Sequence, residues 1–328
     1  MINSANLIGF ESLVQLRYLV INKLPESIGS LGNLEFLIVE TDYDVYITPA
    51  IVKMKKLRYL HAIGATFHED CDSSQSNNME FLAKVIIVNL KNEEMLKCSP
   101  HLVKLKCEFY PLCVEENEAY RYPDLSFLTQ LESLEMTTTH INRRNISRMM
   151  DINFPSNLKK LTLDGLRLPW EKMSIIGLLP KLQVLILRYR AFVGRIWETR
   201  DGEFQQLRFL NMDYIELEQW NVSSNEHFPT LRRLVLHGCH YLKEIPREIG
   251  EIETLQSIEI ESCPKSVGES VVQIEQEQRD MGNEELKVYV GYLLDGWHWY
   301  GSVQFKSVKW RQDIVLAVRA LYKYMAIN

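Results

Sequence analysis

The sequence predicts an α/β repeat solenoid, in which short parallel strands stack into one curved sheet and loops or short helical turns cover the opposite side. Three observations predict it: an apolar phrase recurs along most of the chain, its copies are nearly evenly spaced, and two connecting segments are near-copies of each other. The chain has 328 residues, of which 46% are hydrophobic and 24% are charged. A repeat array accommodates this length in one unit, because it grows by adding coils and not by enlarging one core.

The repeated phrase consists of an apolar residue, two variable residues, a second apolar residue, one variable residue and usually a third apolar residue. Leu16, Leu19 and Ile21 make the first clear copy, and the weakest copy ends at Lys84. Eleven copies are present, and they begin at Leu16, Leu34, Leu57, Met79, Leu102, Leu131, Leu158, Leu182, Leu207, Leu231 and Leu255. Successive copies start 18, 23, 22, 23, 29, 27, 24, 25, 24 and 24 residues apart. Most of these intervals lie within the range of about 20–29 residues that is typical of leucine-rich repeats.

The phrase has a simple physical meaning. Its second and third apolar positions lie two residues apart, so they face the same side of a short strand. That side points into the coil, and the residues between them point outward. Parallel stacking of such strands gives a curved sheet whose outward residues form one concave face, with loops and short helical turns on the convex side. The sequence therefore predicts a leucine-rich-repeat solenoid of about eleven repeats.

Two connecting segments support this register. Residues 24–29 (LPESIG) and 245–250 (IPREIG) are near-copies at corresponding places in their repeats. The apolar pair at a spacing of four is expected to anchor a helical turn in each segment. The final glycine suits a left-handed exit from such a turn.

The cysteines are expected to be buried and not to form a site. Cys239 and Cys263 each lie eight residues after the first leucine of a repeat, which places them in neighbouring coils. Two buried thiols are the favoured interpretation, and a redox pair or a metal site is the alternative. The one other group of cysteine and histidine, which is Cys98, His101, Cys107 and Cys113, matches no zinc-binding spacing, and Cys107 occupies a core position of the fifth repeat.

No motif for catalysis or cofactor binding occurs. The sequence contains no phosphate-binding loop, no HExxH, no GxSxG and no CxxC. We therefore expect no catalytic residue, no cofactor and no metal, and a chain that is not an enzyme. A hydrolase site around His298 in the tail is a remote alternative.

Two repeats are long, and their extra residues are expected to form loops. The first loop holds Glu115, Glu116 and Glu118, and the second holds Arg143, Arg144 and Arg148, as the sequence shows. These opposite charges either pair with each other or belong to two solvated loops, and solvated loops are the favoured alternative.

The sequence predicts three regions. Residues 1–263 form the solenoid, whose N-terminal end lacks a convincing cap and is expected to be truncated. Residues 264–290 form a C-terminal cap, with a helix at 264–282 and a last strand at 286–290. Residues 291–328 form an aromatic and basic tail of unknown role. Packing back on the solenoid is the favoured interpretation, and disorder or a tail appended by an unusual transcript are the alternatives.

Location and partner class follow from what the sequence lacks. It has no signal peptide and no apolar run of the roughly 18 residues that span a bilayer. We therefore expect a cytoplasmic chain without an integral membrane segment, with a nucleocytoplasmic location or a peripheral one at a membrane as the alternatives. The net charge is −6 and no block of lysine and arginine occurs, so nucleic acid is not the expected partner.

Several phrases carry a family resemblance. They are LRYLH at 57–61, FPSNLKKLTL at 154–163, RLPW at 167–170, RAF at 190–192, DGEF at 201–204, HFP at 227–229 and MGNEEL at 281–286. They resemble the leucine-rich-repeat domain of plant coiled-coil nucleotide-binding immune receptors, and more narrowly the late blight resistance group of the nightshade family. The resemblance implies a recognition module that senses a pathogen effector or a guarded host protein. It also implies upstream coiled-coil and nucleotide-binding domains, which this sequence does not contain.

The outward positions of the strands are the candidate partner-binding residues. The candidates are Arg17, Tyr18, Arg58, Tyr59 and His61 near the N-terminus, and Arg208, Phe209, Asn211, Asp213, Arg232, Arg233 and His237 near the C-terminus. Aromatic and arginine side chains are frequent anchors of protein interfaces. The alternatives are rings that stack on their own neighbours or pack on an upstream domain, and an ordinary solvated face. A free-standing adaptor or substrate receptor is the second functional hypothesis.

Overall fold

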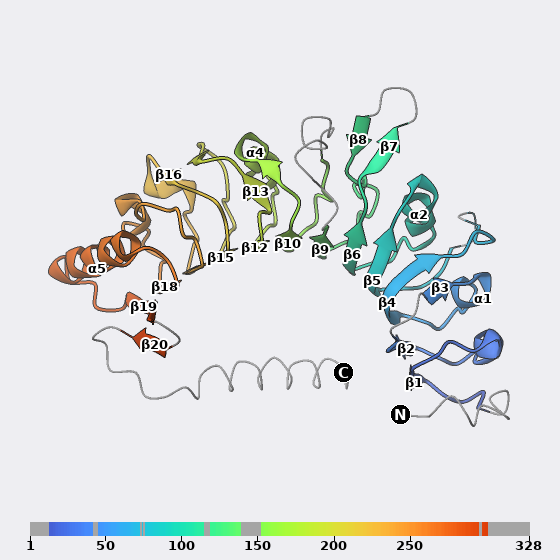
Figure 1. Ribbon diagram of the computed structural model, residues 1–328. Helices are drawn as coiled ribbons and strands as arrows, with labels where there is room; N and C mark the ends of the chain where they lie inside the picture. The colour runs from blue at the N-terminus through green and yellow to red at the C-terminus, as the bar shows by residue number, and fades with distance from the viewer. Residues whose placement is uncertain are drawn as a thin grey trace.

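The computed structural model is an open arc, with strands along its inner side and helices and turns along its outer side (Figure 1). It describes residues 13–41, 45–72, 74, 76–114, 119–138, 152–294 and 297–300. Side-chain contacts of residues 112–114, 119–120, 225, 292–294 and 297–300 are outside this description.

The inner side of the arc is a 14-stranded sheet. Eleven of its strands coincide with the eleven phrases: β1 (Tyr18–Ile21), β2 (Phe36–Val39), β4 (Tyr59–Phe67), β5 (Phe81–Ile87), β6 (Lys104–Phe109), β9 (Ser133–Thr137), β10 (Lys160–Asp164), β12 (Val184–Arg188), β15 (Phe209–Asp213), β17 (Arg233–His237) and β18 (Ser257–Glu261). Neighbouring strands of this series pair in parallel, with equivalent positions of the phrase opposite each other, as in Leu134, Leu161 and Leu185. The predicted leucine-rich-repeat solenoid is therefore confirmed.

The core runs through the middle of the coils as one continuous apolar cluster. The second leucine of each phrase is fully enclosed; Leu134, Leu161, Leu185 and Leu210 are each 0% exposed. Burying one leucine side chain stabilises the fold by roughly 1.5–3 kcal/mol. Because every coil supplies equivalent leucines, this stabilisation is spread along the arc.

Short elements cover the convex side. The α-helices there are α1 (Pro49–Val52), α2 (Leu90–Met95) and α4 (Met173–Gly177), and the 3-10 helices are η3 (Glu26–Ser30), η4 (Leu96–Cys98), η5 (Trp170–Lys172), η6 (Asn225–His227) and η7 (Arg247–Ile249). Further strands are β3 (Val45–Ile47) beside β4, the pair β11 (Leu168–Pro169) and β13 (Phe192–Val193), and the pair β14 (Ile196–Glu198) and β16 (Gln219–Asn221). Three tryptophan rings stack here through successive coils. The ring centroid of Trp197 lies 5.1 Å from that of Trp170 and 5.0 Å from that of Trp220.

The weakest copy of the phrase contains an extra residue. Lys84 does not occupy the third inward position, because its φ of 64° turns the backbone out of the strand. The pairing register shifts there, and Val85 lies opposite Cys107 in its place. Val85 is 0% exposed and fills the core, which leaves the lysine side chain in solvent. The repeat is thus intact but bulged.

The two similar connecting segments do form turns, which are η3 and η7. The expected reason for their glycines is wrong, since the φ of Gly250 is −66° and Gly29 is not among the residues with positive φ. Close packing requires them instead. A Cβ on Gly250 would lie 2.5 Å from Cγ2 of Ile274, and a Cβ on Gly29 would lie 3.0 Å from Cβ of Ala50.

The C-terminal end of the array contains the expected helix and strand. Helix α5 (Lys265–Asp280) buries Val267, Val271 and Ile274, and Gly282 follows it with a φ of +90°. Strand β19 (Lys287–Leu294) extends the sheet in parallel beside β18. Strand β20 (Trp297–Tyr300) then pairs with β19 in the antiparallel direction, so the sheet runs beyond residue 290. The division into three regions remains a prediction.

The first long repeat forms a hairpin of β7 (Leu112–Val114) and β8 (Ala119–Arg121) on the outer side of the arc (Figure 1). Arg121 donates two hydrogen bonds of 2.8 Å to the carboxylate of Glu93 and so joins the hairpin to α2. The acidic residues 115, 116 and 118, the basic residues 143, 144 and 148, and the tail from 301 to 328 lie outside the described residues.

Candidate protein-binding face

The predicted N-terminal residues lie on the concave side of the first coils. The rings of Tyr18, Phe36, Tyr59 and Phe81 form a continuous aromatic ladder, with centroid separations of 6.1, 5.7 and 4.2 Å. Tyr18 is 46% exposed at the end of this ladder. The rings therefore do stack on their neighbours across the sheet, and they also present an apolar strip to solvent.

The predicted arginines beside the ladder already have partners. Arg17 donates two hydrogen bonds of 2.8 Å to the carboxylate of Glu35, and Arg58 forms an ion pair with Glu80. The hydrogen bond from Arg17 lowers the pKa of Glu35. These pairs link adjacent coils on the solvent-exposed side, where an ion pair contributes little stability. Their guanidinium groups remain accessible to a partner.

His61 lies in the same part of the face. Burial lowers the pKa of its imidazole, and the charges of Lys84 and Lys106 lower it further. The side chain is therefore neutral at physiological pH, and it adds a hydrogen-bonding group and not a charge to the N-terminal part of the face.

The predicted C-terminal residues gather on β15 and β17. The guanidinium of Arg233 lies 5.6 Å from the ring centre of Phe209 and 2.8 Å from the carboxylate of Glu259. Asn211 donates a hydrogen bond of 3.4 Å to Asp213, and the ring of His237 lies 3.9 Å from the same carboxylate. The side chains of Arg208 and Arg232 are exposed at the start of these strands. The structure brings this set together but leaves it separate from the N-terminal set.

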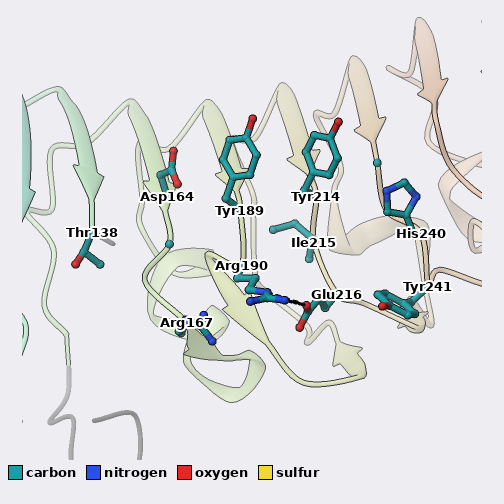
Figure 2. A pocket seen from close by; sticks show the side chains of 12 residues that line it. Thr138, Asp164, Arg167, Tyr189, Arg190, Tyr214, Ile215, Glu216, His240 and Tyr241 are labelled. Atoms are coloured by element: carbon teal, nitrogen blue, oxygen red, sulfur yellow. Dashed lines mark hydrogen bonds and ion pairs between the residues drawn. The ribbon is translucent and has the colours of Figure 1, made fainter. Parts of the chain in front are cut away.

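A third feature adjoins the predicted C-terminal set, since the ring of Tyr214 lies 4.9 Å from that of His237, and sequence reasoning missed it. A cavity of about 540 Å³ opens at the carboxyl ends of strands β9 to β17. Figure 2 shows the rings of Tyr189 and Tyr214 side by side in adjacent coils, with the carboxyl group of Asp164 beside Tyr189. The Arg190–Glu216 ion pair, with a separation of 2.7 Å, lies below the rings. We call this feature the tyrosine pocket.

The tyrosine pocket depends on an unusual backbone column. The residue seven positions after the first leucine of a repeat has a positive φ in five successive coils, at Gly165 (76°), Tyr189 (43°), Tyr214 (53°), Gly238 (64°) and Ser262 (56°). A left-handed conformation costs a residue other than glycine roughly 1–2 kcal/mol. Glycine avoids this cost, whereas Tyr189 and Tyr214 adopt the left-handed conformation despite it. The signal in the sequence is the presence of glycine at Gly165 and Gly238, at the same repeat offset as the two tyrosines.

Carboxyl groups beside the tyrosine pocket lack full compensation. Burial raises the pKa of Asp164, and the nearby negative charges of Glu135 and Asp213 raise it further, against the opposing effect of Arg188. Burial likewise raises the pKa of Asp213, although Arg188 lies 3.5 Å from its carboxylate.

Glu135 shows the contrasting case. Burial of its carboxyl favours a higher pKa, but the hydrogen bond and the charge of Lys106 outweigh burial and lower it. The two groups lie 2.8 Å apart. On this face a nearby cation therefore offsets the burial of Glu135 on β9. The nearby cations do not fully offset the burial of Asp164 on β10 or of Asp213 on β15.

Cys239 and Cys263 are free and buried, and they lie in neighbouring coils as their repeat offset predicts. The hydrogen bond with Cys263 and the burial of the thiol raise the pKa of Cys239 well above its ordinary value. Cys107 is also buried, as its core position predicts. Within the described ranges, no group of three or more histidine, cysteine, aspartate or glutamate residues has an arrangement that could hold a metal ion. The same residues include no helix long and apolar enough to cross a bilayer.

A curved parallel sheet built from leucine phrases, with short turns on its convex side, defines a leucine-rich-repeat protein. No protein-family model matches the chain. Its sequence is 33% identical to a late blight resistance protein homologue of Solanum demissum, over 84% of this chain and 22% of that protein. It is also 33% identical to the late blight resistance protein R1-A of the same species, over 81% of this chain and 21% of that protein. The chain is thus a leucine-rich-repeat relative of the late blight resistance proteins, and it spans about a fifth of their length.

Solved structures include a distant match. An internalin of Listeria monocytogenes aligns with 87% of this chain and 89% of its own, at 13% identity and a TM-score of 0.47.

Proposed function

We propose that this chain is the protein-recognition segment of a plant disease-resistance protein and carries no catalytic activity. The observation that carries the proposal is its homology to late blight resistance proteins along 84% of its length. In this proposal the concave face senses a pathogen effector or a guarded host protein in the defence response. The accessible aromatic ladder and the C-terminal arginines support it, because such side chains are common anchors in protein interfaces.

The proposal includes a second role in restraint. A nucleotide-binding switch, which this sequence lacks, would be held inactive by contact with the repeats until a ligand arrives. The N-terminal ladder is the proposed contact for that switch, because its apolar rings and arginines lie together at one end of the arc. Cytoplasmic location follows from the same proposal.

The test is co-expression with a coiled-coil and nucleotide-binding fragment of a late blight resistance relative, followed by co-precipitation. One variant carries Arg17→Ala, Tyr18→Ala, Arg58→Ala and Tyr59→Ala. A matched control carries Arg208→Ala and Arg232→Ala, which remove exposed arginines from the other end of the face.

We expect the first variant to lose association and the control to keep it, with both folded by circular dichroism. Failure of the folded wild-type chain to associate would contradict the restraint role. It would favour the second candidate, a free-standing leucine-rich-repeat adaptor or substrate receptor.

A further inference from the structure

The two tyrosines of the tyrosine pocket differ in what covers their rings. Tyr189 and Tyr214 are nearly parallel, with centroids 5.4 Å apart and planes 7° apart, so each ring covers one face of the other. The second face of Tyr214 lies against Gly238, where an added Cβ would be 2.6 Å from the ring. On the opposite side of Tyr189 the same backbone column carries Gly165, which has no side chain to cover the ring.

Gly165 is fixed as glycine by its surroundings. Its φ is +76°, and a Cβ at this position would lie 2.1 Å from the backbone oxygen of Thr138. No residue with a side chain can therefore replace it without moving the neighbouring coil. Within the described part of the chain, this backbone column leaves one face of Tyr189 uncovered, and the tyrosine is 57% exposed.

The open ring face lies beside an anionic group. Asp164 directly precedes Gly165, and Figure 2 shows its carboxyl group next to the ring of Tyr189. Two nearby cations have other partners, since Arg190 is paired with Glu216 at 2.7 Å and Arg188 lies 3.5 Å from Asp213, while Arg167 also lines the pocket. Burial raises the pKa of Asp164, and the positive charges of Arg188 and Lys84 oppose this effect.

We infer that the tyrosine pocket binds an arginine side chain of a partner protein. The planar guanidinium would lie on the open face of Tyr189 and donate hydrogen bonds to the carboxylate of Asp164. Stacking of arginine on an aromatic ring and pairing with a carboxylate use the same planar group, so both contacts form together. The left-handed strain at Tyr189 and Tyr214 is consistent with this role, because strained residues cluster at binding sites.

This inference deepens the proposed function, since it rests on the concave side recognising protein. It adds the chemistry of one anchor residue of the partner. The cavity of about 540 Å³ is large enough to admit a side chain with part of its backbone.

The experiment uses the full chain and three blocked tripeptides, acetyl-Gly-Arg-Gly-amide and its lysine and citrulline counterparts, with binding followed by NMR chemical shifts. Citrulline keeps the shape of arginine and lacks its charge. We expect saturable binding of the arginine peptide, weaker binding of the lysine peptide and at least tenfold weaker binding of the citrulline peptide. Equal binding of either counterpart, or no saturable binding of the arginine peptide, would overturn the inference.

Variants separate binding from folding. Asp164→Asn and Tyr189→Ala are each expected to weaken the binding of the arginine peptide at least tenfold. Glu269→Gln on α5 is the matched control, because it removes one negative charge from a side chain that is 63% exposed and far along the chain. Unchanged affinity in Asp164→Asn, or an equal loss in Glu269→Gln, would show that general charge and not the pocket binds the peptide.

Tyr214→Gly adds a readout that a purely structural role would not give. It removes the ring that supports Tyr189 and also relieves a left-handed strain, so we expect weaker peptide binding without a lower melting temperature. A large fall in the melting temperature would assign the tyrosine to packing alone. If the peptides do not bind while the co-precipitation described above succeeds, the arginine inference is wrong and the proposed function stands.

Discussion

Single residues in this protein are constrained through the next coil and not through their own neighbours in sequence. Gly238 illustrates this, since its lack of a Cβ gives room to the ring of Tyr214 one coil away. Gly165 does the same for the backbone of Thr138. The requirement at each position comes from a residue about 24 to 27 places earlier, as the sequence shows.

Gly238→Ala should therefore destabilise the fold through two effects. The left-handed φ of +64° costs alanine roughly 1–2 kcal/mol, and displacement of the Tyr214 ring adds to that loss. Gly202→Ala is the control, because its φ is +80° and nothing lies within 4 Å of the added Cβ. We expect a larger loss for Gly238→Ala in denaturant unfolding. The difference in lost stability between Gly238→Ala and Gly202→Ala should disappear when Tyr214 is also changed to Gly. If the difference persists in that background, the Tyr214 ring is not its cause.

Asp164 and Glu135 should affect the pH dependence of stability in opposite directions. Asp164 has a raised pKa, so the folded chain keeps a proton there over a pH range in which the unfolded chain has lost it. Its contribution is most favourable below the ordinary aspartate pKa and falls as pH rises through the folded pKa. Asp164→Asn should therefore be more stable than wild type at neutral pH, and the difference should vanish in acid.

Glu135 has a lowered pKa, so its contribution is present above the ordinary glutamate pKa and is lost as pH falls through the folded pKa. Glu135→Gln should be less stable than wild type at neutral pH, with the gap closing in acid. Urea unfolding at a series of pH values measures both variants. The same sign of change for both would refute the charge balance described for this face.

At the scale of elements, helix α5 is the part whose burial pattern is clearest. It turns Val267, Val271 and Ile274 toward the last coils and exposes Val272, which is 53% accessible. Ile274 also contacts the turn at η7, where Gly250 leaves room for its side chain.

Ile274→Ala should cost roughly 2–5 kcal/mol, the usual loss for truncating a large buried aliphatic residue. Val272→Ala on the opposite side of the same helix should change stability by no more than about 0.5 kcal/mol. Denaturant unfolding compares the two variants. Similar small effects would mean that α5 contributes little to the stability of the array.

The sequence predicted the strands and helices whose apolar residues repeat at a regular spacing within one segment. The eleven strands and the helix at 264–282 follow from residues that repeat along one segment, so their spacing alone identifies them. The bulge at Lys84 and the pair β14–β16 were not predictable in this way, because each depends on contacts between coils. The hairpin β7–β8 was not predictable because it lies in an extra segment that does not repeat. The outward binding columns follow from strand alternation, whereas the tyrosine pocket depends on left-handed φ values that a tyrosine does not signal.

At the scale of the whole molecule, each coil contacts mainly its two neighbours. The main sheet follows chain order from β1 to β19, with β3 beside β4 and β20 beside β19, and within that series each strand pairs with its immediate neighbours. Stability is therefore close to a sum of coil and interface contributions. Damage to one coil is expected to stay near it.

Leu161→Ala provides the test, since Leu161 is 0% exposed on β10 in the middle of the arc. We expect hydrogen exchange to accelerate most in β9, β10 and β12, with β17 and β18 much less affected. Mass spectrometry of exchanged peptides measures this gradient. A uniform loss of protection along the whole array would show that the solenoid unfolds as one cooperative unit.

The last coils have a consequence for how such a chain can change in length. Leu207, Leu231 and Leu255 are each 24 residues apart, and β15, β17 and β18 pair in identical register. Recombination within the gene that adds or deletes one 24-residue unit here would leave every inward leucine aligned. The core would continue through the junction, while the concave face would gain or lose one strand of outward side chains.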